Sequence, residues 1–368
     1  MAKQVTTKLR QSASLILLAK NKSPVPSATY DYNVCILNNC FERFNLLSIT
    51  LQALLLTRQS KSSFMPDSSV FPGGVCEATD ASPAWLEHFQ RHDAGAVKLK
   101  EFCQATQIEV LNPTDQTLNT ALSLRLTALR ETFEEMGILL CRDRKTLTST
   151  EGYAQFNEQF DRKHWQREVH NDASMFLTLC KELDVLPDLW SLHEWCTWRT
   201  PSTFKMRFQT AFYLTALKDQ PNVLSEVNEV KAYDWHSPLD YLQSALKKEI
   251  WLPPPQVYEL SRFLNFKSLE QLREFAQQRQ VNGSVLIHPV MYKCTDGVVH
   301  LLPGDDMYPE NPDATADKID TGLSTEAFRA LAKKNLHRTE HKNQHESQLL
   351  INFNPADGQV NPIDPRTL

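Results

Sequence analysis

Phe71-Pro72-Gly73-Gly74 and, much later, Arg130-Glu131-Thr132-Phe133-Glu134-Glu135-Met136-Gly137-Ile138 are the two stretches of this sequence that decide the fold. The first supplies a glycine turn and the second a carboxylate-rich helix. Residues three and four apart share one face of a helix, so Glu131, Glu134 and Glu135 converge on a patch about one turn tall. Three carboxylates repel one another unless a cation lies among them, and hard divalent ions such as Mg²⁺ are commonly held jointly with substrate phosphates. The two stretches therefore predict a metal-assisted site for phosphate chemistry.

The composition limits the class of protein. With 368 residues the chain can bury a sizeable core, and we favour one elaborated domain over two ordinary ones. Lys and Arg number 39 against 44 Asp and Glu, a formal net charge of -5. This balance excludes a broad basic surface that binds nucleic acid non-specifically, although a local basic pocket is compatible with it. The eight cysteines include no CxxC pair, which is typical of a reducing compartment.

The ends of the chain carry the signals that bear on localisation. No uninterrupted apolar run reaches the roughly 18 residues of a membrane helix, so we expect no membrane span. Residues 1–27 hold five Lys or Arg, several Ser and no acid, as in a mitochondrial transit peptide. Residues 14–19 also have the pattern of a buried first strand, and we favour that interpretation. The C-terminal Arg366-Thr367-Leu368 ends in Leu but lacks the small-basic-Leu pattern of a peroxisomal address.

The segment 121–137 gives the strongest helix signal. Apolar residues repeat there at spacings of three or four, opposite the acidic patch, and Gly137 is a natural C-terminal stop. The adjacent Gly73 and Gly74 indicate a backbone that takes unusual torsions or approaches another group closely, the alternative being a simple tight turn. Between the two, residues 81–120 are expected to be an insertion with some helix, because closure cost rises only slowly with loop length.

The remaining pattern alternates between helices and strands. We expect strands at residues 12–19 and up to Leu56, an antiparallel pair at 192–200 and 206–217, a strand that ends at Trp235, and a hairpin at 285–292 and 298–302. We expect helices at residues 153–168, 173–183, 238–248, 256–264 and 268–278, with Asp172 as the N-cap of the second. From Pro303 onward the sequence predicts a tail of uncertain order.

The two opening stretches resemble the Nudix box, in which Gly, five residues, Glu and seven residues precede Arg-Glu-U-x-Glu-Glu-x-Gly-U, with U apolar. Here Gly74 plus five residues reaches Asp80, where the family has Glu. Arg130 follows 50 positions later (130 minus 80) instead of eight. Thr132 is polar at an apolar position. The sequence is therefore similar to a Nudix box interrupted by a long insertion.

Such an interruption resembles the coenzyme A diphosphatase branch of the Nudix hydrolases known as nudix motif nineteen. Further stretches resemble the same branch, and they extend the similarity from about residue 12 to residue 309: Phe64-Met65-Pro66, Pro187-Asp188-Leu189-Trp190-Ser191-Leu192-His193, Arg207-Phe208-Gln209-Thr210-Ala211-Phe212, Lys248-Glu249-Ile250-Trp251-Leu252-Pro253-Pro254-Pro255-Gln256 and Leu301-Leu302-Pro303-Gly304-Asp305. The resemblance implies an α/β fold, the Nudix α/β/α sandwich with a mixed sheet. The Nudix domain would span residues 10–280, and a C-terminal extension with a hairpin and a tail would span 281–368. It also suggests the peroxisome, with the mitochondrion or cytosol as alternatives.

The resemblance also implies a reaction. Nudix enzymes split a diphosphate linked to a nucleoside, and this branch would hydrolyse coenzyme A or acyl-coenzyme A to 3′,5′-ADP and 4′-phosphopantetheine or its acyl form. Mg²⁺ or Mn²⁺ would be bound by Glu134, Glu135 and the Gly74 carbonyl. Glu131 would serve either as a third ligand or as the base. Arg130 would hold a neighbouring glutamate through its planar fork. Such ions neutralise the charge that phosphoryl transfer gathers on oxygen and lower the pKa of water.

Two alternatives remain open at this stage. The substrate could be another nucleoside diphosphate such as NADH, ADP-ribose or a capped nucleotide, because substrate choice resides in loops. The chain could also be an inactive Nudix-fold binding protein, which the shorter Asp80 favours and the complete second half of the box opposes. A small-molecule substrate is the one partner predicted; the sequence indicates no oligomeric state.

Several residues outside the box are further candidates. A later carboxylate, Glu229 or Glu226, could assist catalysis. Arg58 lies at the distance before the turn at which coenzyme A enzymes carry an Arg-containing stretch, although Ser63 and Asp67 stand where that stretch has a second Arg and a Gly. Candidate substrate contacts are thus Arg58, Phe71, Gly73 and Arg207, with Lys205 as an alternative for the 3′-phosphate.

Two other features predict no chemistry. His337, His341 and His345 have the four-residue spacing of metal-binding helical histidines, but their segment is highly polar, and we do not assign a metal there. Cys76 lies close to the glycine turn without an evident base, so we expect a small buried thiol instead of a nucleophile.

Overall fold

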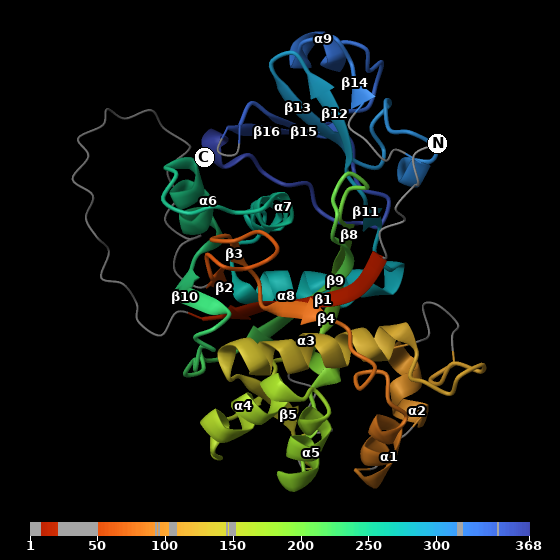
Figure 1. Cartoon of the computed structure of the whole chain (residues 1–368), viewed down its shortest axis with the longest axis vertical. Coiled ribbons are helices and arrows are strands. Elements are labelled where there is room, and N and C mark those ends of the chain that lie inside the picture. The colour runs from red at the N-terminus through yellow and green to blue at the C-terminus, as the bar shows by residue number, and fades with distance from the viewer. Residues whose placement is uncertain are drawn as a thin grey trace, which may run out of the picture.

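A computed structural model of the protein describes residues 9–20, 51–92, 94, 96–102, 109–144, 146, 152–314, 319–343 and 346–368. Within these residues an eight-stranded mixed sheet lies between two layers of helices, and a five-stranded sheet follows it (Figure 1). This arrangement confirms the predicted α/β/α sandwich with a mixed sheet. No helix in the described ranges is long and apolar enough to cross a membrane.

The main sheet has the strand order β10-β2-β1-β9-β8-β11, with β3 paired to β2 and β4 paired to β1. Its strands are β1 (Leu9–Ala19), β2 (Gln52–Arg58), β3 (Ser69–Val70), β4 (Gly73–Val75), β8 (His193–Arg199), β9 (Arg207–Leu217), β10 (Val230–His236) and β11 (Leu286–Ile287). β1 runs parallel to β9 and antiparallel to β2, whereas β8 and β9 are antiparallel, as predicted.

β1 is central because both of its faces are covered. Leu15 and Leu17 belong to the core under one helical layer, and Ile16 and Leu18 belong to the core under the other. A strand buried on both faces has a continuous apolar run instead of alternation. The strand interpretation is therefore confirmed for residues 9–19, while residues 1–8 and 21–27 of the alternative transit peptide lie outside the described ranges.

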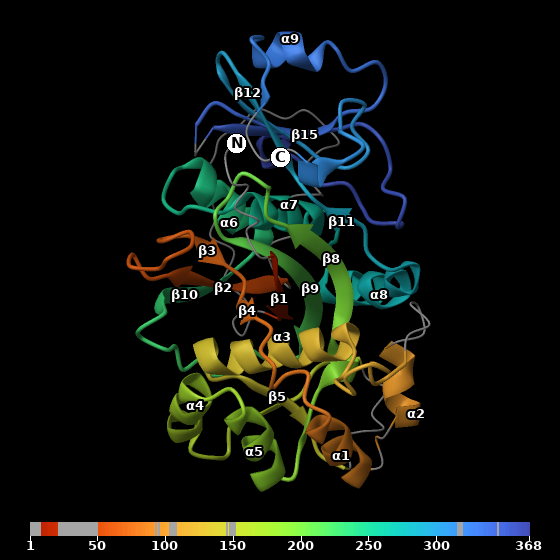
Figure 2. The same cartoon turned by 45° about the vertical axis from the view of Figure 1, so that its right-hand side comes forward.

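The two helical layers lie on opposite faces of the sheet (Figure 2). One layer consists of α1 (Ala84–Arg91), α2 (Ala96–Leu99), α3 (Thr120–Met136), α4 (Arg162–Asn171) and α5 (Met175–Glu182). The other consists of α6 (Pro238–Leu246), α7 (Pro254–Phe263) and α8 (Leu269–Arg279). Beyond α3 lies a three-stranded sheet of β5 (Leu139–Arg142), β6 (Phe156–Asn157) and β7 (Leu186–Pro187). Short 3₁₀ helices include η2 (Leu189–Ser191), η3 (Gln280–Asn282), η4 (Pro312–Ala314) and η5 (Pro365–Thr367).

α3 has the predicted ends but a different environment. The side chain of Asn119 accepts a hydrogen bond from the Leu122 amide at 3.1 Å, and Gly137 ends the helix at φ 64°. The acidic face was expected opposite the apolar one, yet Glu134 and Glu135 are buried together with the apolar residues. The reason is that the main sheet covers one side of α3 while α4 and β5 cover another.

Two predictions about the helices after α3 were wrong. The helix expected at 153–168 begins only at Arg162, because β6 precedes it and the Asp161 side chain caps it by accepting a hydrogen bond from the His164 amide at 3.0 Å. Asp172 is not the N-cap of α5, a position that Ser174 takes. The Asp172 carboxylate instead accepts a hydrogen bond from the Ser174 amide at 2.9 Å.

The C-terminal region forms a sheet of its own, with the strand order β14-β12-β13-β15-β16. Its elements are β12 (Val290–Cys294), β13 (Gly297–Leu301), β14 (Ile319–Asp320), α9 (Thr325–Arg329), β15 (His337–His341) and β16 (Ser347–Ile351). The predicted hairpin is confirmed as β12 and β13, although residues 286–287 join the main sheet as β11. The predicted tail was wrong, because β15 has no apolar residue and its sheet buries only a small apolar core.

Candidate active site

The glycine turn and the acidic helix, far apart in the sequence, are in direct contact. β4 pairs antiparallel with β1 and lies against α3. The Gly73 amide donates a hydrogen bond to Glu135 Oε2 at 2.9 Å. A Cβ on Gly74 would lie 2.4 Å from Glu131 Cδ, and a Cβ on Gly73 would lie 2.3 Å from the Ala13 carbonyl oxygen. The two glycines are therefore required by close approach, which the alternative of a simple tight turn does not explain.

Arg130 connects the two halves of the interrupted signature. Its Nε and Nη2 donate to Asp80 Oδ1 and Oδ2, both at 2.8 Å, and Nη2 also donates to the Val75 carbonyl at 3.0 Å. Nη1 donates to Glu131 Oε1 at 3.0 Å and to Glu134 Oε1 at 2.6 Å. Burial disfavours the guanidinium charge, but the hydrogen bonds to Asp80 and the charge of Glu131 outweigh it and raise the pKa of Arg130. The predicted contact of Arg130 with neighbouring glutamates is present.

Asp80 serves as the anchor of this network. Besides the fork of Arg130, it accepts hydrogen bonds from Thr127 Oγ1 at 2.9 Å and from the Glu77 amide at 3.0 Å. Both of its oxygens are thus engaged within the fold, which leaves it structural. The shorter side chain at this position still reaches Arg130, so it gives no support to the idea of a degenerate site. The polar Thr132 is also accommodated, because its hydroxyl donates to the Ala128 carbonyl at 2.7 Å.

The three glutamates of the helix form a charge cluster that is short of positive charge. Burial raises the pKa of Glu131 to about 8 and that of Glu134 to about 7, and the charges of neighbouring carboxylates add to this shift. The positive charge of Arg130 opposes it. Burial and then the charge of Glu131 raise the pKa of Glu135 well above its usual range, although the Gly73 amide opposes this shift. A cation among these carboxylates would offset both the cost of burying their charges and their mutual repulsion.

The donors fit a hard divalent cation in their chemistry. Carboxylate oxygens are offered by Glu131, Glu134 and Glu135, and the Gly74 backbone, which lies against the Glu131 side chain, would add its carbonyl oxygen. Such an all-oxygen set is the one that these ions prefer. Glu131 and Glu134 are turned toward Arg130. Among the described side chains no three acids, histidines or cysteines converge on one metal-sized point. Arg130 donates to Oε1 of each carboxylate, which leaves Oε2 of each as the oxygen that a cation would bind.

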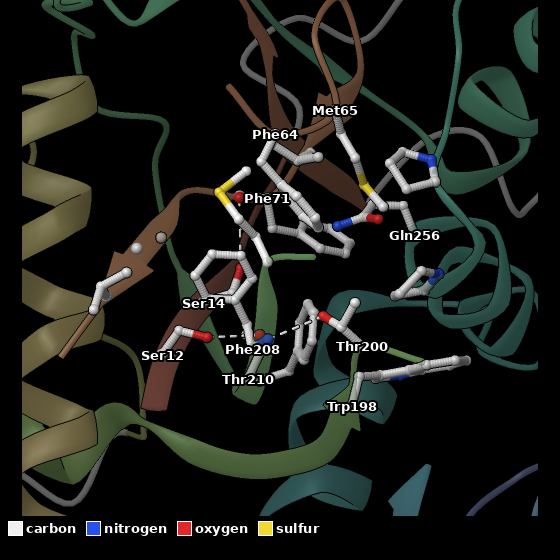
Figure 3. A pocket seen from close by; sticks show the side chains of 18 of the residues that line it. Ser12, Ser14, Phe64, Met65, Phe71, Trp198, Thr200, Phe208, Thr210 and Gln256 are labelled. Atoms are coloured by element: carbon white, nitrogen blue, oxygen red, sulfur yellow. Dashed lines mark hydrogen bonds between the residues drawn. The ribbon is translucent and has the colours of Figure 1, made fainter. Parts of the chain in front are cut away.

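A cavity of about 480 Å³ opens beside the carboxylates, with Glu131 and Glu135 in its lining. It is lined mainly by aromatic and apolar side chains: Phe64, Met65, Val70, Phe71, Val75, Trp198, Phe204, Met206, Phe208, Phe212 and the three prolines 253–255. Several of them surround the cavity in Figure 3. Pro289 and His300 of the C-terminal region also line it. One chamber thus joins the acidic cluster to an apolar space.

Three of the four predicted substrate contacts lie on this cavity. Phe71, Gly73 and Arg58 are in its lining. Arg58 donates from Nε and Nη2 to Ser62 Oγ at 3.1 and 3.0 Å, and its charge acts to lower the pKa of Glu135. Arg207 is different, because it lies outside the lining and its Nη2 donates to Asp313 Oδ1 at 3.0 Å. The structure therefore does not bring Arg207 to the site.

The structure distinguishes the two candidate late carboxylates. Glu226 uses its Oε2 to accept hydrogen bonds from the amides of Asn228 and Glu229, at 2.8 and 2.9 Å, so it shapes the turn. Glu229 lines the cavity, and its charge acts to raise the pKa of both Glu134 and Glu135. Glu229 is thus the carboxylate that faces the acidic cluster.

Residues that the sequence had discounted remain apart from this chemistry. Burial raises the pKa of the Cys76 thiol, which disfavours a thiolate nucleophile. His337 and His341 lie on strand β15 and not on a helix, and His345 lies outside the described ranges. Trp198, which the sequence indicated as part of the core or of a pocket wall, lines the cavity from β8. Gln256 lines it from α7, and sequence reasoning assigned no role to that residue. Only the similarity of the stretch that ends at Gln256 pointed toward it.

Comparisons with known proteins identify the family of this chain. A family model described as the NUDT19 Nudix domain matches residues 9–263, and one described as the NUDT19 C-terminal domain matches residues 291–352. Proteins named acyl-coenzyme A diphosphatase NUDT19 are 37% identical in Homo sapiens (84% of this chain, 86% of the relative) and 35% identical in Gallus gallus (96% and 94%). A solved NUDIX hydrolase from Alicyclobacillus acidocaldarius is 19% identical over 73% of this chain and 97% of its own, with a TM-score of 0.49. The chain belongs to the NUDT19 family of Nudix hydrolases.

Proposed function

We propose that this protein hydrolyses the diphosphate bond of coenzyme A and acyl-coenzyme A, with Mg²⁺ or Mn²⁺, to give 3′,5′-ADP and 4′-phosphopantetheine or its acyl form. The relatives named acyl-coenzyme A diphosphatase, which align with most of this chain, support this substrate class. The observation that carries the proposal is the single cavity that joins the buried carboxylates of α3 to an apolar, aromatic chamber. A diphosphate that carries a long, partly apolar arm matches both ends of such a cavity.

The residues divide the work by position. Glu131, Glu134, Glu135 and the Gly74 carbonyl would hold the divalent ion, which when bound supplies charge neutralisation of the diphosphate and a lowered pKa of water. Arg58, which lines the cavity near Glu135, would pair with a diphosphate oxygen through its planar fork.

The remaining roles are orientation and proton transfer. The Glu229 carboxylate lines the same cavity as Glu131 and Glu135 and would accept the proton of the attacking water. Arg130 orients Glu131 and Glu134 through hydrogen bonds from its Nη1, while Asp80 fixes the position of Arg130. Orientation of this kind contributes because small misplacements of reacting groups are costly in rate.

The test is a substrate panel with purified protein, with and without Mg²⁺ or Mn²⁺, and with products identified by mass spectrometry. Coenzyme A, acyl-coenzyme A, NADH, ADP-ribose and a capped dinucleotide are compared at equal concentration. Metal-dependent release of 3′,5′-ADP from coenzyme A is the expected result. Intact coenzyme A alongside cleavage of another dinucleotide would transfer the activity to that substrate, and tight binding without turnover would indicate a binding protein.

A further inference from the structure

The side chain of Gln256 in the cavity wall has a buried oxygen without a hydrogen-bond partner in the described part of the chain. Gln256 is the third residue of α7, and Figure 3 shows its side chain in the cavity with those of Phe64, Met65 and Phe71. Only 6% of the residue is exposed, and its Oε1 has no hydrogen-bond partner among the described residues. A buried amide oxygen without a donor is a free-energy cost that a ligand can remove.

The other buried polar side chains of the cavity are satisfied. Ser14 Oγ donates to the Pro72 carbonyl at 2.9 Å, and the hydroxyls of Ser12 and Thr210 are 2.7 Å apart. Trp198 Nε1 donates to Glu259 Oε1 at 2.8 Å. Within the described lining, Gln256 alone carries a buried side-chain atom without a partner. The missing hydrogen bond is therefore specific to Gln256 and is not a general feature of the cavity wall.

The chemistry of that point selects the ligand group. A carbonyl oxygen only accepts, so the missing partner is an N–H or O–H donor. Pro254 and Pro255 open α7 and have no N–H, so this helix start lacks two of the donors with which helix N-termini bind anions. The site thus suits a neutral group and not a phosphate. A carboxamide in an apolar wall pairs well with another amide, because its Nε2 can donate to the carbonyl of the same group.

We propose that Gln256 is a specificity-determining residue that accepts a hydrogen bond from an amide N–H of the pantetheine arm of the substrate. This inference rests on the proposed function, because the coenzyme A substrate class carries amides along the arm that follows its diphosphate. The apolar neighbours Phe64, Met65 and Phe208 suit the alkyl segments between those amides. The exocyclic amine of adenine offers the same donor chemistry, so the experiment separates the two parts of the substrate.

The experiment uses Gln256→Met, which keeps the length of the side chain and removes the amide. We expect KM for coenzyme A to rise about 10-fold, with kcat within about 2-fold, because a contact remote from the reacting phosphorus binds ground and transition states alike. Inhibition by 4′-phosphopantetheine should weaken about 10-fold, the effect of one hydrogen bond. Inhibition by 3′,5′-ADP should be unchanged. The thermal midpoint should not fall, because an unpaired acceptor has been removed.

Controls make each outcome decisive. Gln278→Met makes the same chemical change on the exposed face of α8 and should alter neither inhibition constant. Gln256→Leu serves as a second apolar variant if the Met variant folds poorly. Weaker inhibition by 3′,5′-ADP would overturn the inference in favour of adenine, and unchanged inhibition by both products would overturn it outright. If the unaltered protein does not cleave coenzyme A, the proposed function fails, which is a different result.

Discussion

Two buried arginines, Arg130 on α3 and Arg338 on β15, each donate hydrogen bonds from Nε and Nη2 to an aspartate. Arg130 reaches both oxygens of Asp80 at 2.8 Å, and Arg338 reaches those of Asp305 at 2.8 and 2.6 Å. They differ in the third nitrogen. Nη1 of Arg130 donates to two glutamates of the cluster beside the cavity, whereas Nη1 of Arg338 has no partner among the described residues. The same type of arginine–aspartate pair thus positions carboxylates of the candidate site in one region and stabilises only the fold in the other.

The largest expected effect is on the structural pair. Arg338→Met leaves the Asp305 carboxylate buried without its cation, so the free energy of unfolding should fall by about 3–5 kcal/mol. Chemical denaturation measures this loss. Below the unfolding transition, kcat per folded molecule should be retained, because Arg338 does not line the cavity. The double variant Arg338→Met/Asp305→Asn removes the unpaired charge and keeps an oxygen for the His337 amide, which donates to Asp305 at 2.9 Å, so it should recover part of the stability. A double variant as unstable as the single one would refute this account.

The next effect tests the chemical region. Glu135→Gln keeps an oxygen for the Gly73 amide and removes a charge from the metal-ligand set. We expect kcat to fall by about 10²–10³-fold, the loss typical of one transition-state stabiliser, while the circular dichroism spectrum and unfolding midpoint are preserved. Glu182→Gln, on the exposed end of α5, is the matched control and should leave kcat unchanged. Equal activity of the two variants would remove Glu135 from the site.

A smaller effect is expected at Gly74, where only shape changes. In Gly74→Ala the new Cβ would lie 2.4 Å from Glu131 Cδ, so the carboxylate must move. A displacement of this size should lower kcat about 10- to 100-fold and raise the Mn²⁺ concentration needed for half-maximal rate. Steady-state kinetics over a Mn²⁺ titration measures both quantities. A reduced kcat with an unchanged Mn²⁺ requirement would indicate that Glu131 is not a ligand.

The same contrast explains what could be predicted from the sequence. α3 and the glycine turn were predictable because their signals are local: periodicity, a terminal glycine and a motif. β15 was not, because its sequence His337-Arg338-Thr339-Glu340-His341 has no apolar residue, and its burial depends on long-range pairing of Arg338 with Asp305. Sequence patterns report apolar faces and do not report ion pairs between distant segments.

At the candidate site, the box residues and the contact of Arg130 with neighbouring glutamates were predictable, whereas the pairing of Arg130 with Asp80 was not. The spacing of Glu131, Glu134 and Glu135 already implied a cluster. That Asp80 would receive Arg130 depends on how the 81–120 insertion returns to the start of α3, which no local pattern encodes. Gln256 was missed for the same reason: its oxygen is unpaired only because α7 folds over the cavity.

The smallest effect is a pH dependence in the C-terminal region. His337 donates from Nδ1 to the Pro303 carbonyl at 2.7 Å and accepts at Nε2 from Tyr258 OH at 2.8 Å, so it is neutral. Burial lowers its pKa to about 4, against the opposing effect of Pro303. The unfolded chain, with a His pKa of about 6.5, gains a proton between pH ~6.5 and ~4 that the folded chain does not. This histidine's stabilisation is therefore complete above pH ~6.5 and is lost as the pH falls toward ~4.

Removing the imidazole isolates that contribution from every other titrating group. His337→Gln should cost stability at pH 7, and this cost should shrink by about 1–3 kcal/mol between pH 7 and pH 4.5, because the variant no longer loses stability through this proton. Denaturation curves of both proteins at the two pH values give the difference directly. His164→Gln, exposed on α4, should leave the pH dependence unchanged. A cost that is constant with pH would mean that the pKa of His337 is the same in the folded and unfolded chain, and a cost that grows as the pH falls would mean that the folded protein holds this histidine protonated.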